Sequence, residues 1–175
     1  VIRGSNNIDN WLANLNTDTE RKLINGGGVN VHRAYNDIAA NIAAAVKAQY
    51  ASVSTYPAYL RGGSLGGALA LLVAANLSDT FKIAQVVSVG GPKVGATRFN
   101  LPLTNIRHEQ DPVPYLPIWN AVQGWDHDGS TILIKKDGTA RRFENSFHTD
   151  LSLSLLYLEE KLDPSVHTSY REFVK

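Results

Sequence analysis

The stretch from residue 56 to residue 77 constrains the fold most, because a β-rich run passes abruptly into an apolar helix. Residues 56–61 predict a strand, and residues 65–77 predict a helix that is apolar nearly all round and therefore buried. Between them lies Gly62-Gly63-Ser64-Leu65-Gly66. Small residues two positions on either side of Ser64 let strand and helix approach closely, so a sharp turn lifts the serine clear of the sheet. The alternative is a helix-initiating turn in which Ser64 is only the N-cap.

The rest of the chain repeats this alternation of β-rich runs, turns and helix-period segments. Such an order predicts an α/β fold whose mostly parallel sheet is covered by helices on both faces. Strands are expected at 1–3, where the chain starts, and at 29–31, 83–89 and 105–108. Residues 131–135 and 139–143 flank Asp137-Gly138 and predict a hairpin. With 175 residues and one expected core, the chain is predicted to be a single domain over 1–175.

Three further helices are expected. A short one covers residues 8–15, and a final amphipathic one runs from Leu151 to Leu162. The third covers residues 37–50, with Asn36 or Asp37 as its cap. Its apolar stripe, which should face the core, is Ile38, Ile42, Val46 and Tyr50. The triple glycine at 26–28 and the proline-rich segment 111–117 predict loops.

Composition excludes several classes of function. The formal charge is +1, and basic and acidic residues are nearly balanced along the chain, so there is no basic stripe for nucleic acid. The absence of cysteine excludes disulfides, thiolate metal sites and a cysteine nucleophile. No apolar stretch approaches the roughly 20 residues that cross a bilayer. We therefore expect a soluble chain, with secretion slightly favoured and the compartment otherwise open.

A neutral serine hydroxyl is a poor nucleophile, so an active Ser64 needs a base to accept its proton and an acid to orient that base. In folds with such a serine elbow the acid follows the serine and the histidine follows the acid. Asp111 meets the first demand, because it follows a predicted strand and precedes a loop stiffened by proline. Asp126 and Asp128 are its rivals.

The base must be one of five histidines. Three are interpreted as structural or solvent-facing, because they lie in or beside strands ahead of the acid or in the polar tail: His32, His108 and His167. His148 falls in the loop before the final helix, where its ring can reach the C-terminal edge of the sheet. His127 is flanked by two aspartates, a pattern that also suits a solvated loop or a weak metal contact. We favour His148.

These residues together resemble the class 3 lipases, the α/β-hydrolase family of fungal triacylglycerol lipases and related feruloyl esterases. Five motifs follow the family's order: Arg3-Gly4-Ser5, Val31-His32-Arg33-Ala34-Tyr35, Ser64-Leu65-Gly66-Gly67-Ala68-Leu69-Ala70, Gly91-Pro92-Lys93-Val94-Gly95 and Asp111-Pro112-Val113-Pro114. They are similar, in turn, to the oxyanion-hole strand end, the entry to the long helix, the nucleophile elbow, the loop after the next strand and the catalytic aspartate segment. Five motifs in the correct order make accidental similarity improbable.

The resemblance implies an ester hydrolase with the triad Ser64, His148 and Asp111, and with no metal or organic cofactor. It also implies that Ser5 contributes its backbone N–H and hydroxyl to an oxyanion hole, beside the backbone N–H of Leu65. Small-molecule esters or lipids are the implied substrates, met in solution or at a lipid interface.

The chain departs from the family pattern in three places. Gly63 stands where the family usually has a histidine. The chain starts inside a strand, so we expect an upstream segment or a partner to cover that edge of the sheet. The segment 6–28, where the family places its lid, has few large apolar residues, which favours soluble esters. A non-catalytic binding or structural module, and an acyltransferase or a peptidase that uses the same triad, stay open as alternatives.

Overall fold

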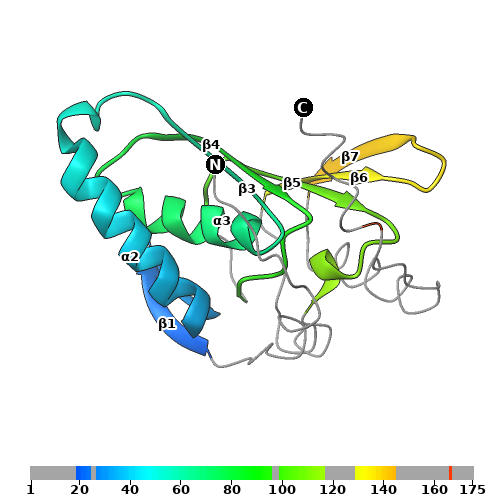
Figure 1. The fold of residues 1–175 in the computed structure, drawn as a ribbon, viewed down its shortest axis with the longest axis horizontal. Helices are drawn as coiled ribbons and strands as arrows, with labels where there is room; N and C mark the ends of the chain where they lie inside the picture. The colour runs from blue at the N-terminus through cyan, green and yellow to red at the C-terminus, as the bar shows by residue number, and fades with distance from the viewer. Residues whose placement is uncertain (1–18, 25–26, 96–98, 117–128, 145–165, 167–175) are drawn as a thin grey trace.

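A five-stranded sheet forms the centre of the computed structural model, which describes residues 19–24, 27–95, 99–116, 129–144 and 166 (Figure 1). The strands lie in the order β3 (Ala58–Gly63), β4 (Ile83–Val89), β5 (Leu103–His108), β6 (Ser130–Ile134) and β7 (Ala140–Glu144). The first four run parallel, and β7 pairs antiparallel with β6. The predicted α/β class with a mostly parallel sheet is therefore confirmed.

The predicted strands differ from the observed ones mainly at their ends. β4 is confirmed at both ends, and the predicted hairpin is confirmed as β6 and β7, each within one residue. β5 begins two residues earlier than predicted, because Leu103 and Thr104 already pair with β4. The prediction that the strand before the serine stops at Arg61 is wrong, since Gly62 and Gly63 continue the pairing with β4.

Helix α3 (Leu65–Leu77) has the bounds that the sequence predicts, and eleven of its residues are buried. It packs on β3 and β4, and α2 (Arg33–Tyr50) packs on α3 on the same side of the sheet (Figure 1). Within the described part of the chain, no helix combines the length and apolar character needed to cross a membrane. The expected helices over 8–15 and 151–162, and the expected strand at 1–3, fall outside the described residues.

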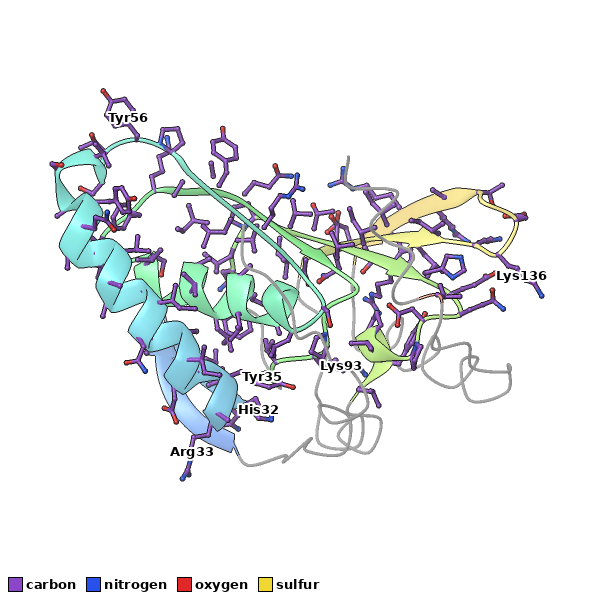
Figure 2. All side chains as sticks on the ribbon, viewed as in Figure 1. His32, Arg33, Tyr35, Tyr56, Lys93 and Lys136 are labelled. Atoms are coloured by element: carbon purple, nitrogen blue, oxygen red, sulfur yellow. The ribbon has the colours of Figure 1, made fainter. Side chains whose placement is uncertain are left out.

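The start of α2 differs from the prediction by four residues. His32 is the N-cap, and its Nδ1 accepts the backbone N–H of Tyr35 at 3.4 Å. The two rings also stack at 3.8 Å between centroids, and Figure 2 shows both side chains at this end of the helix. The predicted caps, Asn36 and Asp37, therefore lie inside the helix. The interpretation of His32 as structural is confirmed.

The predicted apolar stripe of α2 is right at Ile42 and Val46, which are half-buried and pack against the core, and wrong at Ile38 and Tyr50, which are exposed. The buried apolar residues are Tyr35, Ala39 and Ala43, whereas Ile38 is 45% exposed. Asn76 on α3 donates to Asn36 Oδ1 at 3.1 Å, and Ala39 and Ala43 lie on the same side of α2 as Asn36, so small side chains let the two helices approach closely. The larger side chains of the predicted stripe lie to one side of this contact.

A separate two-stranded antiparallel sheet precedes α2, formed by β1 (Thr19–Ile24) and β2 (Gly27–His32). Gly27 and Gly28 pair with Ile24 and Leu23, so the predicted loop at 26–28 is wrong at these two glycines. β1 occupies the end of the segment that the family resemblance assigns to a lid. The backbone N–H of His32 donates to the carbonyl oxygen of Val94 at 2.8 Å, which joins β2 to the loop after β4.

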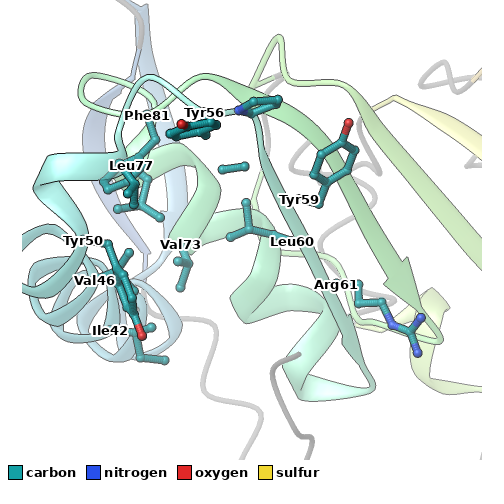
Figure 3. Close-up of a pocket in the computed structure, with 13 residues that line it drawn as sticks. Ile42, Val46, Tyr50, Tyr56, Tyr59, Leu60, Arg61, Val73, Leu77 and Phe81 are labelled. Atoms are coloured by element: carbon teal, nitrogen blue, oxygen red, sulfur yellow. The ribbon is translucent and has the colours of Figure 1, made fainter.

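An apolar groove lies beside β3, the strand at one edge of the described sheet (Figure 3). Its volume is about 340 Å³, and its walls come from α2, the short 3-10 helix η1 (Ala51–Val53), β3 and α3. The main apolar lining residues are Ile42, Val46, Tyr50, Val53, Leu60, Val73, Leu77 and Phe81. Tyr56 and Tyr59 line it too, and they are 69% and 72% exposed. The groove therefore leaves apolar surface in water at this edge.

Candidate active site

Ser64 stands on a strained backbone at the junction of β3 and α3. Its φ is 55° and its ψ is −133°, and among the described residues Asn100 is the other non-glycine with a positive φ. A strained residue of this kind costs on the order of 1–3 kcal/mol. Ser64 is the N-cap of α3 by position, but its side chain makes no capping hydrogen bond. The N-cap alternative therefore leaves this hydroxyl unexplained.

Small residues make the sharp turn at Ser64 feasible. A Cβ on Gly62 would overlap the carbonyl oxygen of Gly66, so strand and helix meet backbone to backbone. This confirms the predicted role of Gly62, the small residue two positions before the serine. Gly63 is different, because a Cβ there would meet only the carbonyl oxygen of Val89, at 3.9 Å.

The sequence reasoning missed a second close contact beneath the turn. Ser88, on β4, is buried, and its Oγ lies where a Cβ on Gly67 or Gly91 would stand. The first turn of α3, the end of β4 and the following loop therefore pack through small groups only. The sequence feature that could have predicted this contact is Ser88 itself, a small residue within a strand that packs against a helix.

Leu65 is the first residue of α3, immediately after the strained serine. The first backbone N–H groups of a helix have no partner within the helix, and they carry the positive end of its dipole. A developing negative charge beside Ser64 would therefore meet a favourable field. Hydrogen-bond donors fixed in such a place stabilise oxyanions during acyl transfer.

Asp111 is fully buried, with 0% of its surface exposed. It follows β5, and its Oδ1 accepts the backbone N–H of Val113 at 2.9 Å. Val113 begins the short 3-10 helix η2 (Val113–Tyr115), which occupies part of the segment predicted to be irregular. Burial and this hydrogen bond hold the carboxyl group in one orientation, as the sequence predicts for a residue beside a proline-stiffened loop.

The parallel sheet brings Ser64 and Asp111 to the same edge. The backbone N–H of Ser64 donates to the carbonyl oxygen of Val89 at 2.8 Å, and that of Gly90 donates to Ile106 at 2.8 Å. These bonds join the C-terminal ends of β3, β4 and β5 in sequence. Two strand spacings, about 10 Å in total, separate β3 from β5. An imidazole that bonds to both side chains would bridge such an interval.

The other predicted site residues lie outside the described part of the chain: Ser5, His148 and the rivals Asp126, His127 and Asp128. Of the predicted site residues, the structure describes Ser64, Leu65 and Asp111, which lie at the C-terminal edge of the parallel sheet. Over the described residues, no group of three histidine or acidic side chains is placed to hold a metal ion.

Comparison with known proteins supports the same family as the sequence motifs. The family model described as "Lipase (class 3)" matches residues 1–121. A secreted mono- and diacylglycerol lipase of Fusarium solani is 36% identical over 126 residues, which are 66% of this chain and 38% of the relative. A lipase of Rhizomucor miehei is 31% identical over 193 residues, which cover 97% of this chain and 50% of the relative.

The solved structures give the same result at the level of the fold. A deletion mutant of the Rhizomucor miehei lipase propeptide complex superposes with a TM-score of 0.72 and 27% identity, covering 96% of this chain and 57% of that one. The fold is therefore that of a lipase-like α/β-hydrolase. The chain belongs to the class 3 lipase family. It spans about half the length of the Rhizomucor miehei relative that it matches.

Proposed function

We propose that this chain is a serine carboxylic ester hydrolase in which Ser64 is the nucleophile, His148 the general base and Asp111 the residue that orients it. The observation that carries the proposal is the strained backbone at Ser64, whose side chain caps nothing at the start of α3. Strain of 1–3 kcal/mol, roughly, persists where function needs the geometry. Family membership supports the same reading.

The reaction is a two-step acyl transfer. Ser64 Oγ attacks the ester carbonyl carbon while His148 takes the hydroxyl proton, and the base then protonates the departing alcohol. Water, deprotonated by the same ring, releases the acyl group and restores the serine. Asp111 holds the ring and stabilises its positive charge without taking the proton. The scheme uses no metal or organic cofactor.

The oxyanion hole is assigned to the backbone N–H of Leu65 and to the backbone N–H and hydroxyl of Ser5. Support for Leu65 comes from its place at the first position of α3, beside the nucleophile. Support for Ser5 comes from the family motif Arg3-Gly4-Ser5. Loss of one such donor typically lowers kcat by about a hundred-fold to a thousand-fold.

The proposed substrates are esters and lipids of short to medium acyl chain, met in solution or at a lipid interface. A secreted mono- and diacylglycerol lipase among the relatives supports the substrate class and favours secretion. A triacylglycerol lipase whose catalytic centre is formed by a serine protease triad, 30% identical with a TM-score of 0.61, supports the chemistry. Turnover of p-nitrophenyl esters of increasing length, with and without detergent micelles, ranks the substrates.

A fluorophosphonate probe tests the proposal directly. The chain should become labelled, and Ser64→Ala should abolish both the label and ester hydrolysis. Ser54→Ala is the matched control, because Ser54 lies after η1, away from the elbow. Absence of labelling in the folded, unmutated chain would favour a non-catalytic module instead. Transfer of the acyl group to an added alcohol, faster than to water, would favour an acyltransferase.

A further inference from the structure

The turn from His108 to Asp111 connects the end of β5 to η2. The backbone N–H of Asp111 donates to the carbonyl oxygen of His108 at 3.1 Å, which closes the turn. Inside the turn, the backbone N–H of Gln110 donates to Nδ1 of His108 at 3.2 Å. His108 thus contributes both its backbone and its ring to the segment that carries the buried carboxyl group.

Both flanks of this turn are anchored by other bonds. The backbone N–H of Glu109 donates to Ile134 at 2.9 Å, and the carboxylate of Glu109 accepts the backbone N–H of Lys136. These two bonds tie the start of the turn to the end of β6. The bond from Val113 to Asp111 Oδ1 ties its exit to η2. Gln110 lies between these two bonded ends and directly precedes Asp111, and the ring of His108 holds it in place.

We propose that His108 is a positioning residue for Asp111. By accepting the N–H of Gln110, its ring sets the direction in which the next residue's carboxyl group leaves the turn. This inference rests on the proposed function, in which that carboxyl group orients the base. His108 itself touches no reacting atom.

The hydrogen bond from Gln110 to His108 determines which side chains can replace the ring. Nδ1 accepts a hydrogen only from its lone pair, so the neutral ring must carry its proton on Nε2. A side-chain acceptor two residues before a backbone N–H is the arrangement of an Asx turn. Asparagine at position 108 can therefore supply the same bond through Oδ1. Leucine fills similar space but has no acceptor.

The experiment compares His108→Leu with His108→Asn in the whole chain, with a p-nitrophenyl ester as substrate. A small misplacement of a catalytic group lowers kcat strongly, so His108→Leu should lose about 10- to 100-fold in kcat, with KM within about twofold. His108→Asn should keep kcat within about threefold of the unmutated chain, because the turn bond is retained.

Ile132→Ala is the matched control for lost packing. Ile132 lies on β6 on the same face of the sheet as His108, since Ile106 and Ile132 are register partners and His108 is two residues beyond Ile106. This variant removes apolar side-chain volume but no bond of the turn. It should lower the melting temperature and leave kcat unchanged.

Three outcomes would overturn the inference. These are full kcat in His108→Leu, an Asn variant as slow as the Leu variant, and an equal loss of kcat in Ile132→Ala. A second readout separates this failure from failure of the proposed function. The backbone amide of Gln110 should be protected from hydrogen exchange in the unmutated chain and in His108→Asn, but not in His108→Leu. This result does not depend on whether the chain hydrolyses esters.

Discussion

Gly62 and Gly63 are neighbours in the chain but meet different surroundings. We expect Gly63→Ala to raise the free energy of unfolding by about 0.4–1 kcal/mol, because it restricts the unfolded chain and its Cβ meets nothing closer than 3.9 Å. Gly62→Ala should lower it by roughly 1–3 kcal/mol, because its Cβ would overlap Gly66. Urea unfolding of both variants checks the pair. Equal effects would mean that α3 moves away from β3 freely.

The same contrast bears on the histidine that the family usually carries before the nucleophile. Position 63 has room for a Cβ, and its backbone is not in the left-handed region. The elbow therefore requires glycine at 62 but not at 63. The departure from the family at Gly63 leaves the strained backbone of Ser64 in place.

Asp111→Asn separates the charge of this residue from its structural bond. Asparagine keeps the Oδ1 acceptor for Val113 but replaces the other oxygen with an NH₂ donor, which favours the wrong tautomer of the base. We expect kcat to fall by about 10³- to 10⁴-fold, with the free energy of unfolding changed by less than about 1 kcal/mol. Ester hydrolysis and urea unfolding measure the two quantities. A kcat within tenfold of the unmutated value would move the role to Asp126 or Asp128.

For single residues, the sequence predicted the position in the fold where that position follows from the order of strands and helices along the chain. Ser64 lies between a strand and a helix, and Asp111 follows a strand and precedes prolines. His108 was interpreted as structural, but its hydrogen-bond partner could not be predicted, because the bond to Gln110 depends on how a four-residue turn closes. The packing of Ser88 against two glycines likewise joins segments that are distant in the chain.

Among the elements, α2 shows where periodicity alone fails. A stripe of large apolar residues predicts the buried face, but the closest approach of two helices selects small residues instead. Ala39 is 0% exposed and Ile38 is 45% exposed. β1 was missed for a related reason: its sequence TERKLI has no apolar alternation, and pairing with β2 stabilises it.

Substitutions on α2 should follow the observed face rather than the predicted stripe. Ala39→Leu is expected to lower the free energy of unfolding by about 1–3 kcal/mol, because Ala39 is 0% exposed and a larger side chain must displace its neighbours. Ile38→Ala should lower it by about 1 kcal/mol or less, because Ile38 is only partly withdrawn from water. Urea unfolding measures both losses. A larger loss in Ile38→Ala than in Ala39→Leu would mean that Ile38 lies on the buried face of α2, as the sequence predicted.

An ion pair links α2 to the turn after α3. Lys47 Nζ lies 2.7 Å from Asp79 Oδ1 and 2.9 Å from Oδ2. The hydrogen bond from Lys47 is the largest cause that lowers the pKa of Asp79 below its ordinary value. A carboxyl group whose pKa is lower in the folded state stabilises the fold above its unfolded-state pKa. That contribution is lost as pH falls through the folded-state pKa.

Lys47→Gln should therefore act only where Asp79 is ionised. The side chain of Asp79 is 71% exposed, so we expect a loss of about 0.2–1 kcal/mol at neutral pH. In strongly acidic solution, below the folded-state pKa, the variant and the unmutated chain should be equally stable. Urea unfolding at both pH values tests this, with Lys82→Gln as the control for loss of one positive charge. A difference that persists in acid would point to lost packing of the lysine stem.

Over the whole molecule, the two ends of the strands have different roles. The C-terminal ends of β3, β4 and β5 carry Ser64 and Asp111, and His32 bonds to the loop that follows β4. The start of β3, at Ala58, borders the apolar groove instead. In the described sheet β3 is an outer strand.

The exposed groove should govern how the chain behaves at high concentration. Outer strands and apolar patches in water promote association, and a lysine on an outer strand opposes it. Tyr59 lies on β3 and is 72% exposed, so Tyr59→Lys should raise the concentration at which light scattering detects aggregates. It should change the free energy of unfolding by less than about 0.5 kcal/mol. Gln85→Lys is the control, because Gln85 is the register partner of Tyr59 on β4 and gains the same charge one strand inward. If both variants raised the threshold equally, net charge would be the cause, and the groove would have no part in association.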